Sequence, residues 1–120
     1  RQTFVGVWIR QLLRGEPIEV WGGEQWRDFT YVDDAVEALL LAAGTPDCVG
    51  RALNLGGFPP VTLHQLARLL VEVNGEGSIH VREFPEEGKR IDIGSYYADD
   101  RRFRGLTGWE PRVPLEVGMA

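Results

Sequence analysis

Residues 22–35 constrain the fold of this 120-residue chain more than any other stretch. Their sequence, GGEQWRDFTYVDDA, joins a glycine pair that favours a turn to an arginine–aspartate pair and then to an acidic pair. The guanidinium of Arg27 is a planar donor that can hold a phosphate or a carboxylate with two hydrogen bonds. On residue type alone, a structural ion pair of Arg27 with Asp28 or another carboxylate is the more common role, and we favour it at this point.

Composition indicates a single small globular region. Hydrophobic residues make up 43% of the chain, which is enough for a core, and the formal net charge is −5. No basic stripe or long apolar run is present, so we expect neither nucleic acid nor a membrane as a partner. Cys48 is the only cysteine and the two histidines lack metal-ligand spacing, so we expect no disulfide, no metal site and a cytoplasmic location.

The first half of the chain predicts two helices and two short extended segments. A helix is expected over residues 3–14, capped by Thr3, followed by a strand over 18–21 and an extended run over 27–32. Asp33 or Asp34 is the expected cap of the second helix, which runs to about Ala43. The apolar face of that helix predicts that it is well buried; its members are Val36, Leu39, Leu40 and Ala43.

The second half predicts a strand over 51–55, a helix, a strand over 78–84 and a short last helix. Thr62 and Gln65 form a capping box for the helix that ends at Asn74-Gly75. Asp99 is the expected cap of the last helix, which runs to about Leu106. The fold class is therefore mixed α/β.

Six short motifs follow one another along the chain. They are an opening Arg-Gln, G-x-P-I-x-V-x-G, R-D-F-x-Y-V-D-D, N-L-G, A-D and G-W-x-P. Together they resemble the NAD-dependent epimerase/dehydratase family, the extended short-chain dehydrogenases that act on nucleotide sugars. The resemblance implies that residues 1–120 are the C-terminal substrate-binding region of such an enzyme, without its Rossmann domain.

The resemblance also implies a site for a nucleotide diphosphate sugar. Arg27 matches the family arginine that contacts the pyrophosphate, and Asp28 then has a structural role. A second cation is expected from the segment 88–99, where either Lys89 or Arg90 stands near the family's arginine position. Without the resemblance, both are equally well read as solvated cations on a loop.

Two aromatic residues complete the expected site. Trp21 matches a position where related enzymes place an aromatic near the nucleotide base, so it is expected either to stack on a uracil or thymine or to pack in the core. Phe29 follows the Arg27-Asp28 pair, where family members contact the base by side chain or backbone.

The family's catalytic groups do not occur in this sequence. No glycine-rich G-x-x-G-x-x-G loop is present, and none of the three tyrosines has a lysine four residues later. We therefore expect NAD to belong to the parent enzyme, with no cofactor binding and no turnover by this chain.

The family's architecture adds an expectation about partners. It packs the helix over 35–41 and the strand over 53–55 against the cofactor domain, so the chain alone is expected to expose apolar surface and to form a homo-oligomer. The alternative is a stand-alone truncated gene product that acts as an oligomerising or binding module.

Overall fold

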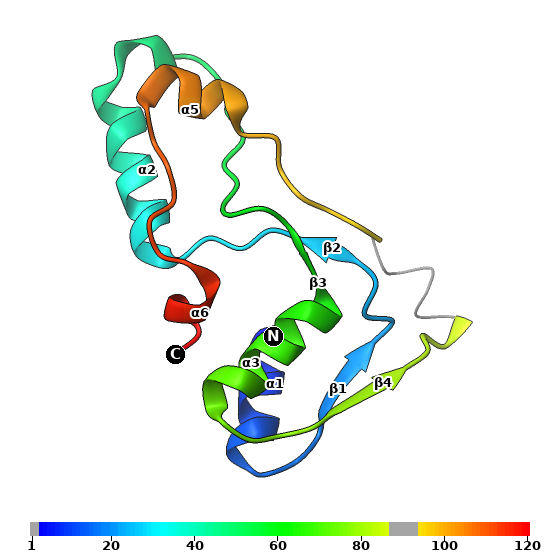
Figure 1. Ribbon diagram of the computed structural model, residues 1–120. Coiled ribbons are helices and arrows are strands. Elements are labelled where there is room, and N and C mark those ends of the chain that lie inside the picture. The colour runs from blue at the N-terminus through cyan, green and yellow to red at the C-terminus, as the bar shows by residue number, and fades with distance from the viewer. Residues whose placement is uncertain (1–2, 87–93) are drawn as a thin grey trace.

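The computed structural model describes residues 3–86 and 94–120. Figure 1 shows α1, α3, β1 and β4 gathered at one end, α2 and α5 side by side at the other, and β2 and β3 between them. The elements are α1 (Phe4–Leu13), β1 (Ile18–Trp21), β2 (Trp26–Arg27), α2 (Val32–Gly44), the 3-10 helix η1 (Pro46–Cys48), β3 (Val61–Thr62), α3 (Leu63–Asn74), β4 (Ile79–Arg82), α5 (Arg101–Thr107) and α6 (Leu115–Gly118).

The parallel pair β1–β4 and two helices form the first core. β1 and β4 lie in parallel with Ile18 opposite Ile79 and Val20 opposite Val81, and Ile18 and Val20 are fully buried. The other edge of β1 is covered by α1: the Trp8 indole N–H donates to the Glu19 carbonyl at 2.9 Å, and Gln11 Oε1 accepts from the Glu19 N–H at 3.2 Å. The edge of this small sheet is thereby closed to further strands.

The helix ends follow the sequence closely. Thr3 accepts a hydrogen bond from the Gly6 N–H, as expected of the α1 cap. Thr62 and Gln65 form the predicted capping box of α3, and Gly75 ends that helix in the left-handed conformation with φ of 83°. These two caps are confirmed, as are the strands at β1 and β4.

The second core lies between α2 and the C-terminal segment. Ala38, Phe103 and Trp109 are buried together, and Leu53 and Leu55 pack against them. Buried Asp34 joins these parts, because its carboxylate accepts from the N–H groups of residues 112 and 113 at 3.0 Å and its carbonyl accepts from the Trp109 indole.

Two predicted caps are wrong. Tyr31 occupies the N-cap of α2 without a side-chain hydrogen bond, and both aspartates lie in the first turn. Asp34 is unavailable as a cap because its carboxylate binds the backbone after Trp109. At α5 the N-cap is Asp100 rather than Asp99.

Two predicted segments also differ. Residues 51–55 are not a strand in the structure, since no described strand lies beside them to complete a ladder, although Leu53 and Leu55 face the core. The extended run after the glycine turn is a strand only at β2, which pairs antiparallel with β3. The helix α6 was not expected.

The predicted burial of the α2 apolar face is wrong as well. Leu39 and Leu40 are each 69% exposed and Val36 is 47% exposed, because the buried side of α2 is the one that carries Asp34 and Ala38. We call this exposed apolar face the α2 stripe; it consists of Val32, Val36, Leu39, Leu40 and Ala43.

The chain is also more open than a compact domain of its size. Its radius of gyration is 16.6 Å, against about 14 Å for a compact 120-residue domain. Its accessible surface is 8331 Å², roughly 1800 Å² above the usual value for a compact monomer of this mass. No helix in residues 3–86 and 94–120 is long and apolar enough to cross a membrane.

Truncation of a core leucine tests the first core. Leu66 is fully buried, so we expect Leu66→Ala to lower the free energy of unfolding by about 2–5 kcal/mol. Leu13 is 77% exposed on α1, and Leu13→Ala is the matched control with an expected change within about 0.5 kcal/mol. Urea denaturation followed by tryptophan fluorescence measures both; equal losses would contradict this assignment of the core.

Candidate functional site

A cleft of about 240 Å³ brings together two of the five predicted site residues, Trp21 and Arg27. It lies where β1 ends and β2 begins, between α1 and the start of α3. Half of its lining residues are aromatic, and the rest are one leucine, one cation, one carboxylate and one amide: Phe4, Trp8, Glu19, Trp21, Gln25, Arg27, Leu63 and Phe84.

The Trp21 ring forms one wall of the cleft and is 39% exposed. It lies 6.4 Å from the Phe84 ring, centroid to centroid, at a tilt of 33°. The Arg82 guanidinium is 5.9 Å from the centroid of the indole ring and bonds Glu19 at 2.7 Å. Trp21 and Arg82 are opposite each other in the β1–β4 register, so the parallel strand pairing places Arg82 beside this wall of the cleft.

The predicted glycine turn brings the chain back toward Trp21. Gly22 and Gly23 have φ of 75° and 94°, values that glycine adopts without strain. A Cβ atom on Gly22 would lie 2.8 Å from the Phe84 ring, so the turn also needs a glycine for space.

Gln25 closes this turn and was not among the expected site residues. It is buried; its Oε1 accepts from the Gly23 N–H at 2.8 Å and its Nε2 donates to the Trp21 carbonyl at 3.2 Å. A glutamine between a glycine turn and an arginine is a weak signal, since its role depends on the turn conformation. The sequence likewise carried no signal for Phe84 as a site residue, because its position beside Trp21 depends on the register of β1 and β4.

Arg27 is held by backbone carbonyls on two sides. Its Nη1 donates to the Trp26 carbonyl at 2.8 Å and to the Gly94 carbonyl in a short hydrogen bond. The segment 94–98 lies along β2: the Tyr96 N–H donates to the Trp26 carbonyl at 2.9 Å, and Tyr96 bridges Arg27 in parallel. The later motif is therefore adjacent to Arg27. Lys89 and Arg90 lie outside the described residues.

The Asp28 side chain contacts the backbone of the 94–98 segment. Its Oδ2 accepts from the Ala98 N–H at 3.0 Å.

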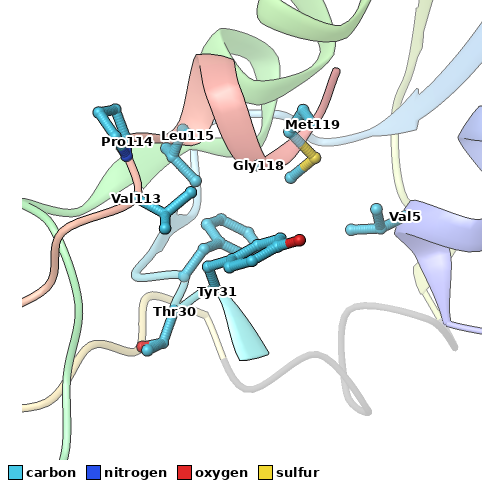
Figure 2. Close-up of a pocket in the computed structure, with 9 residues that line it drawn as sticks. Val5, Thr30, Tyr31, Val113, Pro114, Leu115, Gly118 and Met119 are labelled. Carbon is cyan, nitrogen blue, oxygen red and sulfur yellow. The ribbon is translucent and has the colours of Figure 1, made fainter. Parts of the chain in front are cut away.

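Phe29 lies away from the Trp21–Arg27 cleft. Its ring packs edge-to-face on Phe4 at 6.3 Å and lines a separate apolar pocket of about 150 Å³ between α1, the 29–31 segment and α6. Figure 2 shows this pocket, with the Tyr31 ring below α6 and Val5 of α1 opposite it. The structure thus does not bring Phe29 to Trp21 and Arg27.

A glycine junction lies behind the cleft. The Thr30 hydroxyl donates to the Gly56 carbonyl at 2.7 Å, and Arg104 Nη2 donates to the Gly57 carbonyl at 2.8 Å. A Cβ atom on Gly57 would lie 2.0 Å from the Phe29 carbonyl oxygen. The N-L-G-G segment is therefore packed directly against the R-D-F segment, backbone to backbone.

The charges around the site are paired locally. At the surface, hydrogen bonds from the Arg101 guanidinium lower the pKa of the Asp99 carboxyl below its usual value. Among residues 3–86 and 94–120, no group of three metal-ligating side chains occurs.

Comparison with known proteins finds a matching family and several similar enzymes. Residues 1–56 match the NAD dependent epimerase/dehydratase family. The chain is 36% identical over 117 residues to UDP-D-apiose/UDP-D-xylose synthase 1 of Arabidopsis thaliana, covering 87% of this chain and 30% of that protein. It is 36% identical over 118 residues to UDP-glucuronic acid decarboxylase 1 of Xenopus tropicalis, covering 96% of this chain and 26% of that protein.

A solved structure agrees with these relatives. The chain superimposes on UDP-glucose 4-epimerase from Thermotoga maritima, solved with UDP-glucose, with a TM-score of 0.81 at 31% identity. The match covers 98% of this chain and 37% of the epimerase. The chain thus spans about a third or less of the length of these relatives, and the mixed α/β fold expected from the sequence is confirmed.

Addition of one methyl group tests the glycine junction. We expect Gly57→Ala to lower the free energy of unfolding by roughly 3 kcal/mol, because the new Cβ must displace the Phe29 carbonyl. Gly105 in α5 has no atom within 4 Å of such a Cβ, so Gly105→Ala is the control and should be neutral or stabilising by up to about 1 kcal/mol. Similar denaturation midpoints for the two variants would contradict the close approach.

Proposed function

Since this chain belongs to the NAD-dependent epimerase/dehydratase family, we propose that it is the part of such an enzyme that binds the nucleotide diphosphate sugar. The observation that carries the proposal is that Arg27 and Trp21 line the same cleft. An aromatic ring suits a nucleotide base, and a guanidinium suits a diphosphate.

In this proposal Arg27 binds the diphosphate. Two carbonyls hold its Nη1, so the guanidinium needs little ordering when the ligand arrives. Lys89 or Arg90 is the second proposed cation, and the contact between Arg27 and Gly94 supports a shared site. Trp21 stacks on the base, while Phe29 supports the cleft by packing behind Phe4.

Within the part of the chain that the structure describes, the two glycine pairs do not fit the pyrophosphate of NAD. The Gly22–Gly23 turn is filled by Phe84 and Gln25, and the Gly56–Gly57 pair is filled by the Phe29 carbonyl and two carboxylates. Neither glycine pair leaves room for a pyrophosphate, which needs a glycine-rich loop that opens onto a helix N-terminus. We therefore assign NAD binding and the chemical step to the part of the parent enzyme that these 120 residues do not include.

Loss of the guanidinium tests the ligand site. We expect Arg27→Ala to weaken UDP-glucose binding at least tenfold, since a charge-assisted hydrogen bond contributes about 1.5–3 kcal/mol, and Arg27→Lys to be intermediate because lysine lacks the planar fork. Arg101→Ala is the control, because Arg101 is exposed and pairs with Asp99. Isothermal titration calorimetry measures the affinities; no binding by the unmodified chain at millimolar ligand would contradict the proposal for the isolated chain.

A second property concerns the α2 stripe. Its leucines are exposed on the face of α2 opposite the second core, and the chain has roughly 1800 Å² more surface than a compact monomer. A stable interface buries about 800 Å² on each partner. We propose that the stripe faces the cofactor-binding part in the whole enzyme, and that it drives self-association when the chain is alone.

A charged residue in the stripe tests this association. The unmodified chain is expected to be a dimer or larger in light scattering, and Leu40→Glu is expected to shift it toward the monomer, because a buried charge is costly. Leu13→Glu on α1 is the matched control for an exposed leucine outside the stripe and should leave the size unchanged. A clean monomer at high concentration of the unmodified chain would overturn the proposal.

A further inference from the structure

Asp28 and Arg27 are neighbours in sequence, but only Arg27 lines the cleft. Successive side chains of an extended segment point to opposite faces, and here Arg27 lines the cleft while Asp28 accepts from the Ala98 N–H at 3.0 Å. Asp28 is therefore bound to the segment that also supplies the Gly94 carbonyl to Arg27.

A second carboxylate approaches the same point. A Cβ atom on Gly56 would lie 3.1 Å from Oδ2 of Asp28 and 3.1 Å from Oδ2 of Asp100. The two carboxylates therefore lie on the same side of Gly56, and like charges repel each other unless a cation is near. Arg104 is that cation, because its Nε lies 3.0 Å from Asp100 Oδ2.

Arg104 is itself fixed from two further sides. Its Nη2 donates to the Gly57 carbonyl at 2.8 Å, and its guanidinium lies 5.4 Å from the centroid of the Trp109 indole ring. The Asp100 side chain is 12% exposed and the Arg104 side chain 34% exposed, so the carboxylate is shielded from water while the guanidinium is partly exposed. We call this set the register junction; its members are Asp28, Gly56, Gly57, Asp100 and Arg104.

The register junction acts at one end of the 94–98 segment, and the contacts of Arg27 lie at the other. Tyr96 bridges Arg27 in the middle, and Gly94 accepts from its guanidinium. A slip of one residue would break the Asp28–Ala98 hydrogen bond and move the Gly94 carbonyl away from Arg27. The Asp28–Ala98 hydrogen bond therefore holds the two segments in one register together with the hydrogen bond from the Tyr96 N–H to the Trp26 carbonyl.

We propose that Asp28, supported by the Asp100–Arg104 ion pair, is a positioning residue of the Trp21–Arg27 cleft. It holds the 94–98 segment in register with β2 and thereby sets the position of the Arg27 guanidinium. The register part stands on the contacts alone, whereas the effect on ligand binding rests on the proposed function.

Two readouts on the 120-residue chain separate these parts. Amide hydrogen exchange at Tyr96 and Ala98, measured by NMR, reports the register, and the ratio of the affinities for UDP and uridine reports anion binding. For Asp28→Ala we expect at least tenfold faster exchange at both amides, unchanged exchange in α1 and α3, and about tenfold weaker UDP binding with uridine binding unchanged.

Conservative variants distinguish positioning from a general loss of structure. Asp28→Asn keeps an oxygen that accepts from the Ala98 N–H and should keep both the slow exchange and the affinity ratio of the unmodified chain. Asp47→Ala, at an exposed aspartate in η1, is the control for removal of a carboxylate. If Asp28→Ala does not fold, Asp28→Glu replaces it, since the extra methylene displaces the acceptor from Ala98.

Each outcome decides one part. Unchanged exchange at Tyr96 and Ala98 in Asp28→Ala would overturn the register junction. Faster exchange with an unchanged UDP-to-uridine ratio, or an equal loss for both ligands, would overturn the positioning role. Failure of the unmodified chain to bind either ligand would contradict the proposed function in this chain and the ligand half of the inference, while the exchange data would still decide the register.

Discussion

The close approach of Gly57 to the Phe29 carbonyl is the constraint on which the rest of the structure depends. Any side chain at this position would collide with backbone, so two segments 28 residues apart can meet only through glycine. Their contact brings Thr30 to Gly56 and Arg104 to Gly57, which ties α5 and the late segment to β2. The cleft at Trp21 and Arg27 lies in front of this junction.

The two cores differ in how completely the helices around them are buried. In the first core, α1 and α3 bury Ile18 and Val20, and side chains of α1 form hydrogen bonds with the Glu19 backbone on the outer edge of β1. The second core covers one side of α2 only and leaves the α2 stripe in water. This exposed apolar face is the observation on which the proposed association of the α2 stripe rests.

Charged side chains in this chain have two kinds of position. Some hold segments of the fold together, and Arg27 also lines the cleft. Buried Asp34, together with the partly buried Asp100 and Arg104, contacts backbone groups or the opposite charge, and these contacts hold segments in place. Arg27 combines such backbone contacts with a position on the cleft wall. The sequence places Arg27 and Asp28 side by side, and only the tertiary contacts show that Arg27 lines the cleft while Asp28 binds the Ala98 N–H.

The sequence by itself determined the local features and the family: the α3 capping box, the glycine turn, the strands β1 and β4, and the motif order that names Arg27 and Trp21. These depend on contacts within a few residues or on a pattern of residue types. The tertiary structure decided which face of α2 is buried, that Asp34 binds the backbone after Trp109 instead of capping its helix, and that Phe29 lies away from the cleft. It also placed Gln25 and Phe84 at that cleft and Asp28 against Ala98, because these contacts join distant segments whose register local propensities do not contain.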